Sequence, residues 1–260
     1  MRMRYQWSFF VFTALLALTV ARSVPEEYRE PNTGYIVGGS NAARGQFPYQ
    51  VSLRTLPGIH FCGGAIVGSR WILTAGLCLS RRTPTSVNAF VGSHLLSDST
   101  RYLLSDLVVH PQFNENTMLN DVGLARTQEA IVYSALIQPI ALGSSYIGGS
   151  VIAIATGWGR ITENGPTPNN LQWVNLGTLT NDDCKNRLPP PHVGLIFDST
   201  LCTFTRTDEG VCYGDTGGPL NSGNVVIGIV SWGVRCAISY PDVFTRVSSH
   251  RTWIMENITD

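Results

Sequence analysis

The sequence predicts an all-β protein built from two packed barrels, and three observations lead to this prediction. From Ile36 onward, short segments rich in β-branched and aromatic residues alternate with clusters of Gly, Pro, Asn and Ser at fairly even spacing. Such a pattern is typical of barrels or sandwiches. About 225 residues of this kind are many for one small barrel, so we expect two barrels that divide near Gly143–Gly149.

The individual elements follow from the same pattern. The expected strands are Tyr49–Leu53, Gly64–Val67, Trp71–Ala75, Val87–Val91, Tyr102–Val109, Val151–Thr156, Leu171–Leu179, Val225–Trp232 and Asp242–Val247. After the last strand, Ser248 or Ser249 is placed to cap a terminal helix whose apolar residues Trp253, Ile254 and Ile258 fall near one face. We therefore predict an N-terminal barrel over about 36–145, a C-terminal barrel over about 146–247 and a helix over about 248–258.

The N-terminus reads as a secretory signal. Basic Arg2 and Arg4 precede an apolar stretch over residues 7–20, and Thr19, Val20 and Ala21 form a small-residue cleavage site. We expect residues 1–21 to be a signal peptide, with a signal anchor that stays in the membrane as the alternative. Residues 22–35 are polar, contain proline and lack periodicity, so we expect a propeptide.

Charge and cysteine content restrict the partners and cofactors. The 18 basic and 18 acidic residues cancel, and no run of like charges favours nucleic acid or a membrane surface as partner. Six cysteines in an exported chain suggest three disulfides, although the count allows fifteen pairings. Zinc is the competing interpretation, but the sequence has no closely spaced Cys-x-x-Cys pair. We expect no metal and no cofactor.

Four segments carry a family resemblance: Ile36–Gly39 (IVGG), Leu73–Cys78 (LTAGLC), Asn120–Leu124 (NDVGL) and Gly214–Leu220 (GDTGGPL). In their order and intervals they resemble the chymotrypsin-like serine proteases of the trypsin family, from Ile36 to the end of the chain. The resemblance implies two packed six-stranded antiparallel β-barrels with a short C-terminal helix. It also implies the disulfides Cys62–Cys78, Cys184–Cys202 and Cys212–Cys236.

The resemblance also locates the catalytic triad, which is incomplete. Asp121 is retained, but Leu77 stands where the family has the histidine base, and Thr216 stands where it has the serine nucleophile. Leucine cannot accept a proton, and a hydroxyl without a base is a poor nucleophile at pH 7. We therefore expect a pseudoenzyme that is not an active protease. The alternative is a weakly active serine-type endopeptidase with Thr216 as nucleophile.

The loss of the histidine has consequences for Asp121. A carboxylate left in an apolar pocket is costly to keep ionised, so we expect a raised pKa or a compensating water or hydroxyl donor such as Ser231. No other histidine is expected to replace the missing base, because the family does not bring the segments that carry the others to this point. These histidines are His60, His94, His110, His192 and His250.

The binding machinery is better retained than the chemistry. Gly214 and Thr216 match the positions whose backbone N–H groups form the oxyanion hole, and Ser231, Trp232 and Gly233 match the strand along which substrates align. At the base of the specificity pocket the resemblance places Gly210 and Asp242. This pair resembles the brachyurins, a subgroup of broad specificity. The alternative for Asp242 is an exposed loop residue.

Activation is the remaining feature that the resemblance implies. In the family a cut before the residue corresponding to Ile36 frees an ammonium that pairs with Asp215 and orders the pocket. Tyr35 precedes the cut, where the family usually has Arg or Lys, so we expect part of the protein to stay zymogen-like.

These observations predict a secreted, monomeric protein that binds proteins or peptides through the former substrate cleft. Its expected partners are protease inhibitors, proteases or components of a proteolytic cascade, on which it acts as decoy, cofactor or antagonist. A role carried by exposed loops is the other possibility.

Overall fold

The structure is a computed structural model that describes residues 36–259. The predicted signal peptide and propeptide lie outside the described residues. Within them no helix combines the length and the apolar composition needed to cross a membrane.

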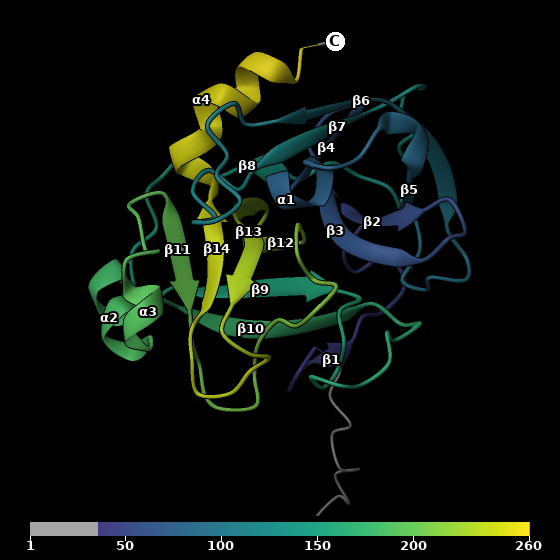
Figure 1. Ribbon diagram of the computed structural model, residues 1–260. Helices are drawn as coiled ribbons and strands as arrows, with labels where there is room; N and C mark the ends of the chain where they lie inside the picture. The colour runs from purple at the N-terminus through teal and green to yellow at the C-terminus, as the bar shows by residue number, and fades with distance from the viewer. Residues whose placement is uncertain (1–35, 260) are drawn as a thin grey trace, which may run out of the picture. The chain divides into compact units, whose positions relative to one another are not determined.

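Six strands form the first barrel (Figure 1). They are β2 (Gln50–Thr55), β3 (His60–Ile66), β4 (Trp71–Thr74), β5 (Val87–Val91), β6 (Thr100–Val109) and β7 (Gly123–Thr127). The order β2-β3-β4-β7-β6-β5 closes on itself because β5 also pairs with β2, and all the pairs are antiparallel. Their inward residues, such as Val51, Leu53 and Leu124, are completely buried.

The second barrel is made of six later strands. They are β9 (Ile152–Gly157), β10 (Gln172–Leu179), β11 (Thr200–Thr203), β12 (Pro219–Ser222), β13 (Val225–Gly233) and β14 (Asp242–Arg246). The order β10-β11-β14-β13-β12-β9 closes through the pairing of β9 with β10. Two short strands join this sheet: β1 (Ser40–Asn41) pairs with β10, and β8 (Ala141–Leu142) pairs in parallel with β13. The predicted fold of two six-stranded barrels is confirmed, whereas the exact domain bounds remain a prediction.

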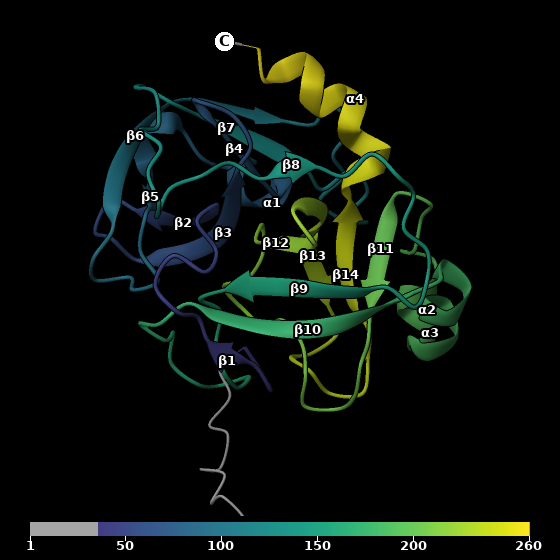
Figure 2. The same cartoon turned by 180° about the vertical axis from the view of Figure 1, so that it is seen from behind.

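The terminal helix is present but begins differently from the expectation. Helix α4 spans Val247–Asn257, and its N-cap is Arg246, which makes no side-chain cap hydrogen bond. The predicted cap at Ser248 or Ser249 is therefore wrong. The reason is that β14 runs directly into the helix (Figure 2), while the buried Arg246 side chain donates to the carbonyl oxygens of Asp198 and Thr200.

The shorter helical segments were not foreseen. They are α1 (Gly76–Leu79), the 3-10 turn Pro84–Ser86, α2 (Asn181–Arg187) and α3 (Pro190–Val193). Each is too short to leave a periodic apolar pattern in the sequence.

Three disulfides join the pairs that the resemblance implied. They are Cys62–Cys78, Cys184–Cys202 and Cys212–Cys236, with sequence separations of 16, 18 and 24 residues. Loops of this size give each bond a stabilisation of about 2–4 kcal/mol. The first connects β3 to α1, and the third joins two segments that line a cavity between the barrels.

Candidate active site

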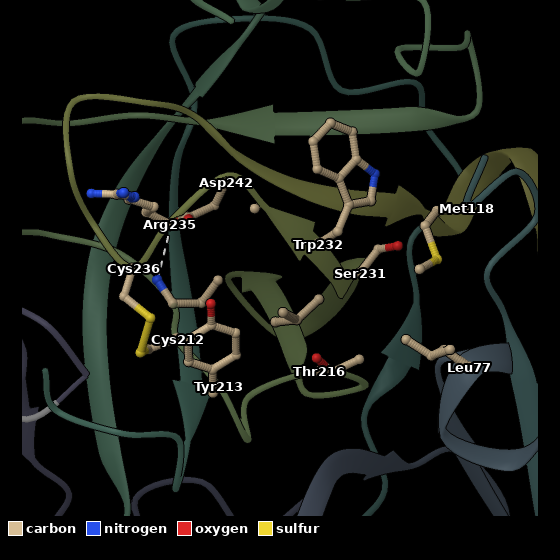
Figure 3. Close-up of a pocket in the computed structure, with 13 residues that line it drawn as sticks. Leu77, Met118, Cys212, Tyr213, Thr216, Ser231, Trp232, Arg235, Cys236 and Asp242 are labelled. Carbon is tan, nitrogen blue, oxygen red and sulfur yellow. Dashed lines mark hydrogen bonds between the residues drawn. A yellow bond between two sulfur atoms is a disulfide. The ribbon is translucent and has the colours of Figure 1, made fainter. Parts of the chain in front are cut away.

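A cavity of about 240 Å³ receives side chains from both barrels. Leu77 of α1 and Met118 of a loop come from the first barrel, and Thr216, Trp232 and Asp242 come from the second. Figure 3 shows Leu77 and Met118 at one end of this site and Asp242 at the other. All three positions of the incomplete triad lie in or beside this cavity.

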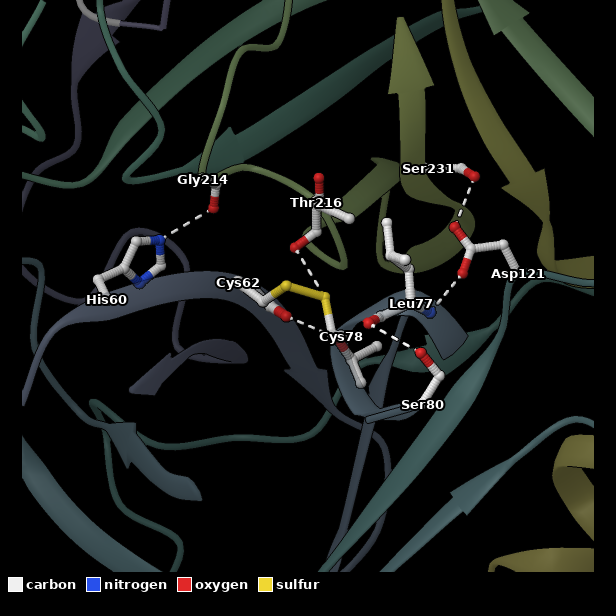
Figure 4. The surroundings of a disulfide bond; sticks show 11 residues. His60, Cys62, Leu77, Cys78, Ser80, Asp121, Gly214, Thr216 and Ser231 are labelled. Carbon is white, nitrogen blue, oxygen red and sulfur yellow. Dashed lines mark hydrogen bonds between the residues drawn. A yellow bond between two sulfur atoms is a disulfide. The ribbon is translucent and has the colours of Figure 1, made fainter. Parts of the chain in front are cut away.

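The backbone of Leu77 contacts the side chain of Asp121. Leu77 lies in α1, and its N–H donates to Asp121 Oδ1 at 2.8 Å. Ser231 Oγ donates to Asp121 Oδ2 at 2.6 Å (Figure 4), so each carboxylate oxygen has a donor. Ser231 is the hydroxyl donor that the sequence led us to expect.

The environment of Asp121 changes its acidity. Burial raises its pKa above the ordinary value, and the hydrogen bonds from Ser231 and from the N–H groups of Leu77 and Gly76 oppose that rise. The residue is completely buried. A serine hydroxyl and two backbone amides thus stabilise the carboxylate that an imidazole would otherwise face.

Thr216 stands on a turn that a glycine makes possible. Gly214, two residues before it, has φ 103°, a conformation that favours glycine. The backbone of Thr216 is held because its carbonyl accepts a hydrogen bond from Gly63 N–H at 2.8 Å. Among residues 36–259, no imidazole or carboxylate is hydrogen-bonded to the Thr216 hydroxyl. A proton leaving this hydroxyl therefore has no dedicated acceptor in the described structure.

Asp242 is buried rather than exposed, so the loop alternative is excluded. It is 4% exposed, and its Oδ2 accepts a hydrogen bond from Val211 N–H at 2.9 Å. A Cβ atom at Gly210 would lie 2.4 Å from Asp242 Oδ2, so the absence of a side chain at 210 makes room for this carboxylate. Burial raises the pKa of Asp242 to about 8, which leaves the group largely protonated at neutral pH.

Asp215 and Ile36, the expected activation pair, are both fully buried. The Asp215 carboxylate accepts hydrogen bonds from Gly159 N–H at 2.7 Å and from Cys212 N–H at 2.9 Å. Burial raises its pKa to about 7. The role of this pair in activation, and the expected zymogen-like fraction, remain predictions.

Several residues at this site were not predicted from the sequence. Met118, Tyr213 and Arg235 line the cavity, and no motif pointed to them. His60 was not expected to replace the missing base, and no role was predicted for it, but its Nε2 lies 2.9 Å from the Gly214 carbonyl oxygen. In Figure 4 it lies on the opposite side of Thr216 from Leu77. Its position in β3, two residues before Cys62, was the available signal.

No group of three His, Cys, Asp or Glu side chains within residues 36–259 is placed to hold a metal ion. The polar groups at the cavity are hydroxyls, backbone N–H groups, buried carboxylates and the guanidinium of Arg235. These can bind a peptide backbone and stabilise a negatively charged oxygen.

Two barrels that share such a cavity, with a hydroxyl on a glycine turn and a buried aspartate nearby, define the class of chymotrypsin-like serine proteases. The family model described as Trypsin matches residues 36–254, and the chain belongs to this family. It is 46% identical to Chymotrypsin-2 of Vespa crabro over 224 residues, which are 85% of this chain and 99% of that protein. It is 33% identical to Trypsin delta of Drosophila melanogaster over 252 residues, 96% of this chain and 98% of that protein. Trypsin II-P29 of Gallus gallus is 35% identical over 253 residues, with 96% and 98% covered.

These relatives correct one expectation from the sequence. The chain was expected not to be an enzyme, but its relatives at 33–46% identity bear the names of proteases, and this contradicts the expectation. The physical error was to treat two substitutions as a loss of function. In the serine protease template, the oxyanion hole and substrate binding alone retain about 10³–10⁴-fold catalysis over water when a triad member is removed. The brachyurin-like subgroup remains a prediction.

Proposed function

We propose that the protein is a secreted endopeptidase of the trypsin family that hydrolyses peptide bonds slowly, with Thr216 as its nucleophile. The observation that carries the proposal is the Thr216 hydroxyl at the cavity, on a turn whose backbone is held by Gly63 and by the hydrogen bond from His60. The protease names of the relatives support the same reaction class. The three disulfides support an oxidising, extracellular location.

The substrate is a protein segment in extended conformation. It lies beside Trp232 and Gly233 at the end of β13, where backbone hydrogen bonds hold it in register. The side chain before the scissile bond enters the cavity toward Val211 and Asp242. Because Asp242 is largely protonated at neutral pH and already bound to Val211 N–H, the cavity favours an uncharged side chain over a basic one.

The chemical step follows from the groups present. The O–H bond of Thr216 breaks, its proton passes to hydroxide or water in the open cleft, and Oγ1 bonds to the scissile carbonyl carbon. The N–H groups of Gly214 and Thr216 stabilise the negatively charged oxygen. The C–N bond then breaks, and the amine takes a proton from water. A further water adds to the ester carbonyl carbon, the bond from that carbon to Oγ1 breaks, and Oγ1 regains a proton from water. Since no imidazole accepts the first proton, the rate is low.

Replacement of the nucleophile tests the proposal. Thr216→Ala should abolish hydrolysis of a reactive peptide ester by protein cut before Ile36. Thr252→Ala, at an exposed threonine of α4, is the matched control and should keep the wild-type rate. Turnover by Thr216→Ala at the wild-type rate would rule out Thr216 as nucleophile.

A second candidate function is retention of protein partners in the same cleft. The site keeps its cavity, while Leu77 supplies no base, so a bound inhibitor or protease segment is processed slowly. This supports action as a decoy, cofactor or antagonist in a proteolytic pathway. The protein should then capture inhibitors or proteases from its native fluid, and Trp232→Ala should weaken that capture. Full biological activity in Trp232→Ala would instead favour a function of the exposed loops.

A further inference from the structure

The end of α4 carries a sequence motif that the proposed reaction does not use. Asn257, Ile258 and Thr259 form an Asn-x-Thr triplet without proline, and no other asparagine of the 260-residue chain is followed by Ser or Thr two positions later. This triplet is the acceptor for N-linked glycosylation in proteins that enter the secretory pathway. Such triplets also occur by chance, so the position of this one in the fold decides whether it is accessible.

Helix α4 carries the triplet away from the packed interior. The first part of the helix is held against the protein, since Val247, His250 and Ile254 are buried. Beyond Ile254 the helix becomes accessible: the Met255 side chain is 45% exposed, and Thr259 of the triplet is exposed. In Figure 1 and Figure 2 the far end of α4 extends past the strands. A transferase can therefore reach the triplet.

The length of the helix separates the triplet from the cleft. His250 Nε2 lies 3.0 Å from Asn120 Oδ1, directly before Asp121, so the start of α4 lies beside the triad position. Asn257 follows about two helical turns later, which places it roughly 10 Å further along the helix axis. Residues 256–259 do not line the cavity between the barrels. An oligosaccharide at this position leaves the cleft open.

The acceptor amide can keep its structural contact after modification. Asn257 Nδ2 donates to the Trp253 carbonyl oxygen at 2.8 Å, and a side-chain amide nitrogen has two hydrogens. In the modification, Nδ2 bonds to the anomeric carbon of a lipid-linked oligosaccharide. The bond from that carbon to the pyrophosphate breaks, and one proton leaves Nδ2 for a base of the transferase. The hydrogen that remains on Nδ2 is sufficient for the bond to Trp253.

We propose that Asn257 is an N-glycosylation site and carries an oligosaccharide in the secreted protein. The proposal rests on the extracellular location that belongs to the proposed function, but not on the reaction of Thr216. The oligosaccharide supplies what the charges of the chain do not, because 18 basic and 18 acidic residues cancel. Proteins with a net charge near zero associate more readily, and a hydrated oligosaccharide beside the exposed Met255 opposes association.

Expression of the full chain in insect cells tests the site. The secreted wild type should carry added mass that a peptide N-glycosidase removes, and this enzyme should leave an aspartate in place of Asn257 in the mapped peptide. Thr259→Ala should abolish the added mass, whereas Thr259→Ser keeps the hydroxyl and should retain it. The matched control is Asn116→Gln, at an exposed asparagine without Ser or Thr two positions later, and it should leave the added mass unchanged.

Two variants separate the effect of the oligosaccharide from that of the hydrogen bond. Thr259→Ala and Asn257→Gln both lose the oligosaccharide, but only Asn257→Gln also changes the side chain that binds the Trp253 carbonyl. Light scattering of both variants should therefore show more association than the glycosylated wild type. Equal association of all three proteins would overturn the role given to the oligosaccharide.

The possible failures are distinguishable from one another. A wild type that is secreted with Asn257 unmodified overturns the glycosylation site and leaves the proposed function intact. A wild type that stays in the cytosol contradicts the extracellular location, and the glycosylation site fails with it. Added mass that persists in Thr259→Ala, or that maps to a residue other than Asn257, also overturns the proposal.

Discussion

The two sides of Thr216 differ in the hydrogen-bond partners of their buried polar side chains, Asp121 on one side and His60 on the other. On one side Asp121 is bound by Ser231 and by backbone N–H groups, and Leu77 occupies the position of a proton acceptor. On the other side His60 is present, but both of its ring nitrogens are engaged, by Ser52 and by the Gly214 carbonyl. The Asp121 side, where the family has its proton acceptor, has no imidazole. On the other side the imidazole of His60 links the first barrel to the Gly214 turn.

This difference shows that a site of this kind separates proton transfer from stabilisation of charge. Under the proposed function, Leu77 supplies no proton acceptor, while the hydrogen bond from His60 of the first barrel still holds the Gly214 turn. The buried carboxylate keeps its partners through Ser231 and the start of α1. We therefore expect slow chemistry in a cleft that still binds peptides.

Leu77→His is the largest expected change. A histidine in α1 would face Asp121 and Thr216 and supply the missing base, which typically contributes about 10²–10⁴-fold. We expect kcat/KM for a chromogenic peptide to rise by this order, and to rise further when Thr216→Ser is added. Adding Asp121→Asn should reverse most of the gain, since the analogous change in the serine protease template lowers kcat about 10⁴-fold. If kcat/KM does not rise in folded Leu77→His, proton transfer and stabilisation of charge by the Gly214 turn are not independent.

The pH dependence of the wild type should be steep. Without a general base, loss of the Thr216 proton depends on hydroxide, so kcat/KM should rise about tenfold per pH unit between about pH 7 and 9. Leu77→His should instead level off above neutrality. The profile is best measured in an Asp242→Asn background, because the pKa of Asp242 lies at about 8. A plateau in the wild type would reveal a base that the described residues do not show.

Asp242 should make the uncut protein less stable as the pH rises. Its pKa is raised by burial from 3.8 unfolded to about 8 folded, so the folded state binds the proton more tightly. The resulting stabilisation is complete below about pH 4 and is lost as the pH rises through 8. Asp242→Asn should therefore stabilise the protein at pH 8 by on the order of 3–4 kcal/mol relative to its effect at pH 5. Asp98→Asn, at an exposed position, should change neither value in thermal unfolding.

Ser231→Ala is the smallest expected effect. It removes a 2.6 Å hydrogen bond to a buried carboxylate, which typically costs about 1.5–3 kcal/mol in unfolding free energy. The pKa of Asp121 should rise further, because the lost bond favours its ionised form. Carboxyl NMR titration measures this shift. An Asp121 pKa at the ordinary value in the wild type would contradict our description of this side of the cleft.

Local patterns made much of this molecule predictable. The strands alternate in burial or carry runs of apolar residues, and the GDTGGPL and NDVGL segments stand on turns that bring Thr216 and Asp121 beside one cavity. The Ser231 donor was predictable because a buried carboxylate needs a partner. Asp242 was assigned to the pocket from few positions, and its close approach to Gly210 gives the physical reason.

What could not be predicted depends on pairing between distant strands. His60 contacts Ser52 and the Gly214 carbonyl only when β2 and β3 pair, with a shift of register between Leu53 and Arg54. The start of α4 at Val247 likewise depends on the burial of Arg246 against the second barrel, not on a serine cap. The expectation that the chain is not an enzyme was wrong. A residue pattern shows which catalytic groups are present, but it does not show the rate of hydrolysis that remains without one of them.

The most direct test of the account is to trap the covalent intermediate. Protein cut before Ile36 is mixed with an activated peptide ester, quenched in acid and analysed by intact mass and peptide mapping. We predict an acyl group on Thr216 that is absent from Thr216→Ala and accumulates faster at pH 9 than at pH 7. Turnover without any acyl group on Thr216, or an acyl group on another residue, would contradict the central claim.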